Sequence, residues 1–301
     1  MPSSSALPAL RVDHVSIAVQ AIAPALARLG RLLPLRMRAE PRPGYDAQFT
    51  WTDFFIGDFK LELIESARPG SFVERFLGRR GEGFHHLSIE LEENRLASYT
   101  AALEAGGLRI VDRGDYGDGD ETAFISPRTA PGILVQFWQV PGFRGDRPAD
   151  VPTDPVVERD GVRYRVDHLA LAVRSIDATL AWFQRSFPVE VTRPRCRGWD
   201  GTHDLLGFQL AGYKLELLES VDERGFVARF LARRGEGFHH LAVDVDRLDR
   251  VEAGLAAEGI RLVDAADLGN SRRTAFVHPR DAHGVLLQFW QEPDFGGPRR
   301  P

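Results

Sequence analysis

The chain has 301 residues, of which 43% are hydrophobic, so it is long enough to form two cores of ordinary domain size. Its formal net charge of −5 excludes the strongly basic surface that binds nucleic acid or an anionic membrane. Its single cysteine, Cys196, excludes an internal disulfide and a thiolate metal cage, and is typical of a reducing compartment.

No segment of the sequence resembles a targeting signal or a membrane span. Residues 1–10 lack the charged start and apolar core of a secretory signal. No uninterrupted apolar run approaches the roughly 20 residues that a helix needs to cross a bilayer. We therefore expect a cytoplasmic protein with neither a membrane nor a nucleic acid as partner.

Four segments of the first half recur in the second half in the same order. The segment 79–87 (RRGEGFHHL) returns unchanged at 233–241, which is 154 residues later. The segment 122–139 returns in similar form at 274–291, which is 152 residues later. This self-similarity predicts one module repeated in tandem. We assign the first module to 1–143, a linker rich in proline, glycine and charge to 144–163, and the second module to 164–301.

The predicted elements follow the same order in each half. Short β-branched or aromatic-rich runs that alternate in character predict strands, and apolar residues at helical spacing predict helices between them. In the first half the strands are 12–19, 59–65, 84–91 and 133–139, and the helices are 21–33, 71–80 and 94–105. The helices expected in the second half are 175–187, 225–234 and 246–258.

Each half also divides into two similar units. Every unit opens with an apolar strand that carries a histidine and closes with an apolar strand that carries Glu or Gln, 48 to 50 residues later. The residues concerned are His14 with Glu62, His86 with Gln136, His168 with Glu216, and His240 with Gln288. We expect function to lie where these strands converge.

The segments 71–92 (SFVERFLGRRGEGFHHLSIELE) and 225–246 (GFVARFLARRGEGFHHLAVDVD) resemble the vicinal oxygen chelate superfamily, and within it methylmalonyl-CoA epimerase. The resemblance implies an α+β fold in which four βαβββ units form two U-shaped mixed sheets. It also implies one divalent metal ion for each sheet. Carried over by position, the ligands are His14, Glu62, His86 and Gln136 in the first module and His168, Glu216, His240 and Gln288 in the second.

One feature departs from the epimerases, which carry the glutamine on the early strand and the carboxylate on the last. This chain has Glu62 or Glu216 early and Gln136 or Gln288 late, which puts in doubt any base function of the late carboxylate. Two imidazoles, one carboxylate and one amide oxygen suit Mn, Fe, Co, Ni or Zn, with positions left open for substrate.

An epimerase also requires a base. Asp46 and Asp200 each lie 16 residues before the expected metal-binding glutamate, where the resemblance implies a free catalytic carboxylate, although each could equally be a turn residue beside glycine. His203 and His278 occur in the second module only and are further candidates for acid or base. Strand alternation places His85 and His239 on the face opposite the ligands.

The sequence favours a metal-dependent epimerase or isomerase that acts on a small-molecule carbonyl compound. Tandem relatives such as the valiolone epimerases suggest a polyhydroxylated cyclic ketone, and the absence of a basic run for CoA phosphates favours this over a methylmalonyl-type acyl-CoA. An Fe(II)-dependent dioxygenase, a glyoxalase-like lyase and a metal-free binding protein remain alternatives. We expect the two halves to pair within the chain as a pseudo-dimer, and a homodimer stays open.

Overall fold

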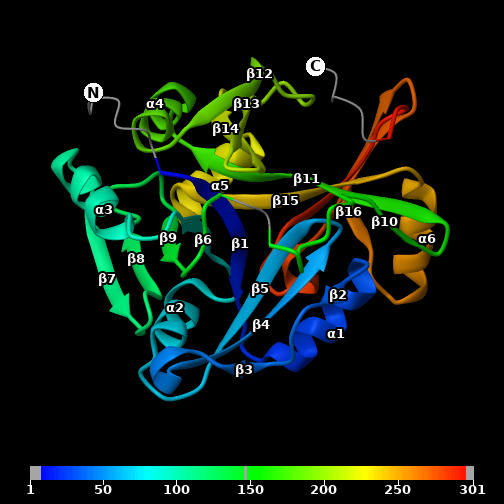
Figure 1. The fold of residues 1–301 in the computed structure, drawn as a ribbon. Coiled ribbons are helices and arrows are strands. Elements are labelled where there is room, and N and C mark those ends of the chain that lie inside the picture. The colour runs from blue at the N-terminus through cyan, green and yellow to red at the C-terminus, as the bar shows by residue number, and fades with distance from the viewer. Residues whose placement is uncertain (1–7, 146–147, 296–301) are drawn as a thin grey trace.

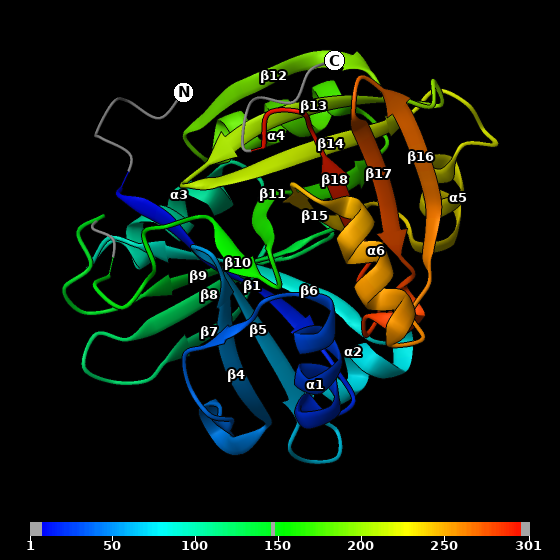
Figure 2. The same cartoon turned by 90° about the vertical axis from the view of Figure 1, so that its right-hand side faces the viewer.

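A computed structural model describes residues 8–145 and 148–295. Each half of this part of the chain forms one nine-stranded mixed sheet with few helices, and the second half lies above the first in the view of Figure 2. The expected α+β fold of two repeated sheets is therefore confirmed. Residues 1–7, which belong to the N-terminal segment without the features of a secretory signal, lie outside the described residues.

The first sheet has the strand order β2-β4-β5-β1-β6-β9-β8-β7, and β3 pairs with β4 (Figure 1). The parallel pairs β1/β5 and β6/β9 each belong to one unit, and the antiparallel pair β1/β6 joins the two units. The strands are β1 (Leu10–Ala18), β2 (Arg36–Met37), β3 (Arg42–Pro43), β4 (Phe49–Ile56), β5 (Phe59–Ser66), β6 (Gly83–Leu91), β7 (Ile110–Asp115), β8 (Glu121–Ile125) and β9 (Leu134–Gln139).

The second sheet repeats this topology as β12-β13-β14-β11-β15-β18-β17-β16. Its additional strand β10 (Val157–Arg159) forms a hairpin with β11 and lies inside the segment 144–163 that we expected to be a linker. The other strands are β11 (Val162–Val173), β12 (Val189–Arg197), β13 (His203–Leu210), β14 (Tyr213–Ser220), β15 (Gly237–Val245), β16 (Leu262–Gly269), β17 (Arg272–Val277) and β18 (Leu287–Gln291).

The helices lie where apolar spacing predicts them, and capping side chains fix two of their starts. Ser71 accepts the N–H of Glu74, and Ser175 accepts the N–H of Ala178. Two short 3-10 helices are η1 (Tyr45–Ala47) and η2 (Pro279–Asp281). The α-helices are α1 (Ile22–Leu32), α2 (Phe72–Arg80), α3 (Leu96–Ala105), α4 (Ile176–Ser186), α5 (Phe226–Arg234) and α6 (Leu248–Ala257). None of the helices in the described ranges has the length and apolar character of a membrane span.

The two faces of each sheet have different neighbours because side chains alternate along a strand. Val15 and Ile17 of β1 belong to the main core, which also contains Leu29 of α1 and extends into the second half. Ala18 of β1 belongs to a separate cluster with Val73 of α2. The short helix α2 therefore covers one end of the face that carries His14, and α5 has the same position in the second half.

The two halves contact each other through reciprocal loops. Gly284 lies so close to Glu82 that an added Cβ would come within 1.8 Å of its carbonyl oxygen, and Gly132 lies similarly against Glu236, at 2.0 Å. The Nδ1 atom of His283 lies 3.0 Å from a carboxylate oxygen of Glu82. The two sheets are thus held in a fixed arrangement by backbone contacts that require glycine.

We predict that Gly284→Ala lowers the free energy of unfolding more than Gly259→Ala does. Both glycines have positive φ, +79° and +75°, so alanine costs each about 1–2 kcal/mol in backbone strain. Only Gly284 also faces a backbone carbonyl, and this overlap adds about 1–3 kcal/mol. Denaturant unfolding of both variants measures the difference. Equal losses of stability would contradict the close contact between the halves.

Candidate metal centres

The four candidate ligands of each module lie on four adjacent strands. In the first module the order β5-β1-β6-β9 carries Glu62, His14, His86 and Gln136. Ser16 is opposite both Glu62 and His86 in the strand register, and Ser88 is opposite both His14 and Gln136. The four long side chains therefore surround two small ones on a single face of the sheet.

The second module repeats this arrangement with alanine in place of serine. Ala170 is opposite Glu216 and His240, and Ala242 is opposite His168 and Gln288. All eight candidate ligands are at most 9% exposed. The small residues leave room above the sheet for an ion between the long side chains.

The distances within each set suit a shared ion. The Nε2 atoms of His14 and His86 are 3.3 Å apart, and the pair His168 and His240 has the same separation. Two nitrogens that each lie about 2.1 Å from one ion at roughly a right angle are about 3 Å apart. A carboxylate oxygen of Glu62 lies 3.6 Å from Nε2 of His14, and one of Glu216 lies 3.3 Å from Nε2 of His168. The two histidines and the glutamate of each module could therefore hold a metal ion.

The aspartate that precedes each first histidine orients its ring. The Nδ1 atom of His14 lies 2.7 Å from a carboxylate oxygen of Asp13, and Asp167 contacts His168 at the same distance. A carboxylate at Nδ1 places the ring proton there and leaves the Nε2 lone pair for a cation. Burial alone would raise the pKa of Asp13, but Lys60 and His14 outweigh it and hold this pKa far below its usual range.

The second histidine of each module is supported by its neighbour. The Nδ1 atom of His86 lies 2.8 Å from Nδ1 of His85, and His240 and His239 have the same contact. Burial lowers the pKa of His85 to about 4 and that of His239 to about 3, so both rings are neutral at pH 7. Burial, His85 and His14 also lower the pKa of His86 well below its usual range, which leaves it neutral as a ligand must be.

Strand alternation predicted the wrong direction for His85 and His239. The register shifts by one residue, so that Ser16 is opposite His86 and Ile17 is opposite Phe84. This β-bulge turns His85 toward the face of His86, where it packs 4.7 Å from the ring of Phe76 on α2. His239 lies in the equivalent bulge and packs 4.8 Å from Phe230.

Hydrogen bonds fix the orientation of each glutamine amide. The hydroxyl of Thr122 donates to the carbonyl of Phe137, so it accepts the amide N–H of Gln136, at 3.2 Å. The Oε1 atom of Gln136 is buried and has no hydrogen-bond partner among the described residues. An amide oxygen without a donor suits a cation, and Thr274 holds Gln288 in the same way, at 3.1 Å.

The candidate acids and bases have different positions. The Nδ1 atom of His203 lies 2.9 Å from a carboxylate oxygen of Asp200, whose two oxygens also accept the N–H and hydroxyl of Thr202. His278 is exposed, and its ring accepts the N–H of Arg280 at the start of η2. The backbone of Asp46 lies in η1, and its side chain is outside the described part of the structure. The structure therefore brings Asp200 and His203 together and leaves His278 at the surface.

The second module has a pocket of about 320 Å³ above its candidate ligands. His203 lies in its wall and is 3% exposed. We call it the second-module pocket, and its lining includes Arg193, His203, Glu216, His240, Arg272 and Gln288. An imidazole held by a carboxylate therefore shares one cavity with three candidate metal ligands.

The corresponding part of the first module is different. Phe49 stands in the position of His203, and the rings of Tyr45 and Tyr116 stack 3.4 Å apart beside Trp138. Gly44 and Gly198 are equivalent and necessary, because a Cβ at either would come within 2.2 Å of the Phe49 or His203 ring. The two modules share the candidate ligands but not the surrounding chemistry.

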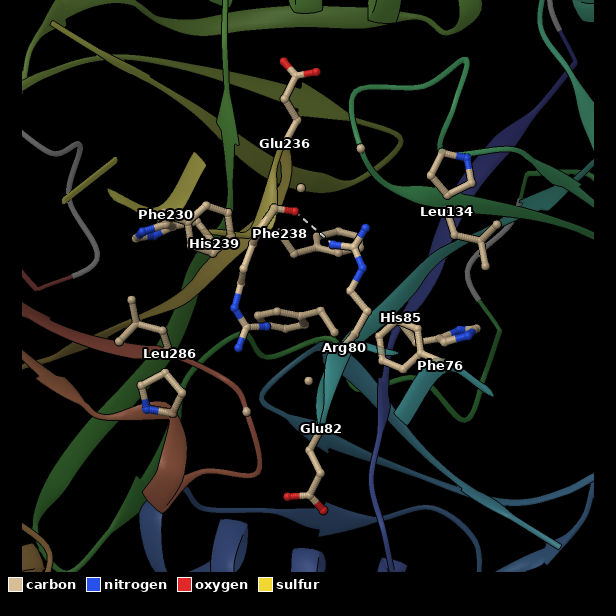
Figure 3. Close-up of a pocket in the computed structure, with 18 residues that line it drawn as sticks. Phe76, Arg80, Glu82, His85, Leu134, Phe230, Glu236, Phe238, His239 and Leu286 are labelled. Atoms are coloured by element: carbon tan, nitrogen blue, oxygen red, sulfur yellow. Dashed lines mark hydrogen bonds between the residues drawn. The ribbon is translucent and has the colours of Figure 1, made fainter. Parts of the chain in front are cut away.

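A further cavity of about 280 Å³ lies between the modules (Figure 3). His85 and His239 lie in opposite walls together with Phe76 and Phe230, and Arg80 donates to the carbonyl of Arg234 across the centre. Since each of these histidines contacts a candidate ligand, this cavity lies behind both candidate centres.

Several supporting residues were not identified from the sequence. The aspartates Asp13 and Asp167 were identifiable, because Val-Asp-His recurs at 12–14 and 166–168. The threonines Thr122 and Thr274 also recur at equivalent positions. Arg193 occurs in one module only, so repetition gives no signal for it.

The model of the glyoxalase/bleomycin resistance protein/dioxygenase superfamily matches residues 13–124 and 167–276. The chain belongs to this superfamily. Each match lies within one of the two modules, and between them they contain six of the eight candidate ligands together with the candidate bases except His278. Gln136 lies between the matched ranges, and Gln288 lies beyond the second.

Relatives of single-module length are similar to part of this chain. An uncharacterised protein of Bacillus subtilis is 33% identical over 44% of this chain and 94% of its own length. The ethylmalonyl-CoA/methylmalonyl-CoA epimerase of Cereibacter sphaeroides is 27% identical over 42% of this chain and 97% of its own. The methylmalonyl-CoA epimerase structure from Mycobacterium tuberculosis is 29% identical over 42% of this chain and 86% of its own, with a TM-score of 0.37.

A solved structure is similar in fold to this chain over both modules. A mutant of 4-hydroxymandelate synthase from Streptomyces coelicolor aligns with 98% of this chain and 95% of its own, with a TM-score of 0.65 and 15% identity. At this identity the likeness concerns the fold alone. It shows that the two-module arrangement occurs in an enzyme chain of the same architecture.

We predict that the purified protein binds two equivalents of a divalent metal, and that His86→Ala and His240→Ala each remove one. The two candidate sets lie on separate sheets, so the loss in one module leaves the other intact. Elemental analysis of wild type and both variants after loading and desalting measures this. Loss of both equivalents in one variant, or of none in either, would contradict two independent centres.

We also predict that Thr122→Val weakens metal binding by the first module. The substitution removes the acceptor that orients the Gln136 amide, and loss of such supporting contacts reduces affinity about 10- to 100-fold. Titration against a chelating dye in the His240→Ala background isolates the first module. Thr52→Val, which loses a bond to a backbone carbonyl away from the ligands, is the control. An unchanged affinity in Thr122→Val would show that Gln136 is not a ligand.

Proposed function

We propose that the protein is a metal-dependent epimerase or isomerase that removes and returns a proton at a carbon next to a carbonyl group. The second module carries this activity. The observation that carries the proposal is that His203, which contacts Asp200, lines the same pocket as Glu216, His240 and Gln288. The substrate is a small polyhydroxylated ketone or a methylmalonyl-type acyl-CoA.

His203 is the base in this proposal. Asp200 accepts the Nδ1 proton of His203, so Nε2 of the ring carries the lone pair that takes the substrate proton. An acid on the opposite face of the planar carbon then returns a proton, because return by the same nitrogen would restore the original configuration. Gly198 leaves space for the His203 ring, because a larger residue at this position would overlap the ring.

The ligand set places the carbonyl group of the substrate. Glu216, His168 and His240 offer one anionic and two neutral donors, and Gln288 adds an amide oxygen. A divalent ion bound there would polarise the carbonyl and stabilise the negative charge that forms when the proton leaves. Epimerases among the relatives of single-module length support this chemistry.

A dioxygenase is the second candidate. Each module contains two histidines and one carboxylate within 4.8 Å of one another, which is the ligand type of non-haem Fe(II) oxygenases. Oxygen uptake by the Fe(II)-loaded protein with 2-oxo acid substrates would favour this function. The imidazole of His203 in the second-module pocket, held by Asp200, favours proton transfer.

We predict that the protein exchanges the α-proton of its substrate with deuterium from solvent, measured by NMR on methylmalonyl-CoA and on cyclic polyhydroxy ketones. His203→Gln should slow the exchange by on the order of 100-fold or more, because it removes the base and keeps its approximate size. Phe49→Leu, at the equivalent position of the first module, should leave the rate unchanged. Exchange that persists in His203→Gln would remove His203 from the mechanism.

A further inference from the structure

We propose that the second-module pocket binds an anionic group of the substrate, a carboxylate or a phosphate, through Arg193 and Arg272, and that the first module lacks this site. The inference deepens the proposed function, on which it rests for the identity of the pocket. It favours substrates that carry a charge next to the reacting centre over neutral ketones.

Cationic side chains enter the pocket from both sides of the ligand set. Arg193 and Arg197 come from β12, at one edge of the sheet, and Arg272 comes from β17, near the other edge. Arg197 already contacts Asp204, at 2.6 Å, and is more than half exposed, so it lies at the mouth. Arg193 and Arg272 are partly buried and line the interior.

Arg193 lies next to the candidate metal centre. Its guanidinium nitrogen Nη1 is 3.7 Å from Oε2 of Glu216, and its side chain is 18% exposed. The Nε atom of Arg193 is buried and has no hydrogen-bond partner among the described residues. A planar guanidinium with a free edge in a cavity is suited to a carboxylate or phosphate.

The second module has space for the Arg193 side chain next to the candidate metal centre. Gly207 pairs with both Arg193 and Glu216 in the register, and a Cβ on it would lie 3.1 Å from Cβ of Arg193. In the first module Asp53 occupies the position of Gly207 and is bound by Arg38 and Lys60. Because Gly207 has no side chain, the Arg193 side chain can reach the candidate metal centre.

The partner of the metal-binding carboxylate differs accordingly. Ser16 donates to Oε1 of Glu62, at 2.8 Å, in the first module. Alanine replaces this serine in the second module, where Arg193 stands beside Glu216 instead. Exchanges at three positions thus place a positive charge beside the centre in the second module alone.

The other two arginines also have no cationic counterpart. The positions of Arg193, Arg197 and Arg272 are occupied in the first module by Ala39, Pro43 and Asp120. Asp120 accepts the hydroxyl of Tyr45, which belongs to the aromatic stack there. At these three positions the second module therefore carries three positive charges and the first module one negative charge.

The test is calorimetric titration of the metal-loaded protein with methylmalonate, inorganic phosphate and neutral dimethyl methylmalonate. We expect one anion to bind per chain and the ester not to bind. Arg193→Gln and Arg272→Gln should each raise the dissociation constant about 10-fold or more, as loss of a charged hydrogen bond does. The tighter of the two anions identifies the carboxylate or phosphate.

Arg195→Gln is the matched control. Arg195 lies two residues from Arg193 but does not line the pocket, and it contacts Glu219 and Asp204, so anion affinity should change less than about twofold. Equal binding of the ester, or unchanged anion binding in Arg193→Gln, would overturn the proposal. Anion binding without proton exchange would refute the proposed function alone, and exchange on a neutral ketone that Arg193→Gln leaves unchanged would refute the anion site alone.

Discussion

The structure depends on the convergence of two imidazole lone pairs on one point above four adjacent strands. Asp13 and His85 each contact an Nδ1 atom, so Nε2 of His14 and Nε2 of His86 face each other at 3.3 Å. Two lone pairs at this distance repel unless a cation or a proton lies between them. Burial raises the pKa of the Glu62 carboxyl, and a cation would also offset this desolvation.

Both modules have this arrangement of two histidines, but the residues around their candidate ligands differ. Both modules keep the aspartate, the bulged histidine and the threonine that orient the ligands. The first module adds stacked aromatic rings, and the second adds the His203–Asp200 pair and Arg193. The modules dock through Gly132 and Gly284, and the second has His203 beside its candidate ligands where the first has Phe49.

Local pattern was sufficient to predict the sheets and the placement of the candidate ligands on adjacent strands. Alternation places His14 and Ser16 on one face, and the repeat places the matching residues on neighbouring strands. The bulge at His85 was not predictable, because one extra residue in β6 is defined only by its pairing with β1. The role of Arg193 was also hidden, because it depends on the absence of a side chain at Gly207 across a strand pair.

We propose that each sheet holds one metal ion between its two histidines, its glutamate and its glutamine. Anomalous diffraction from crystals grown with Mn²⁺ or Co²⁺ tests this most directly, since it locates the ion without reference to activity. We predict one anomalous peak in each module, about 2.0–2.3 Å from the Nε2 atoms and from the Glu and Gln oxygens. Peaks elsewhere, or none at either set of ligands under saturating metal, would contradict it.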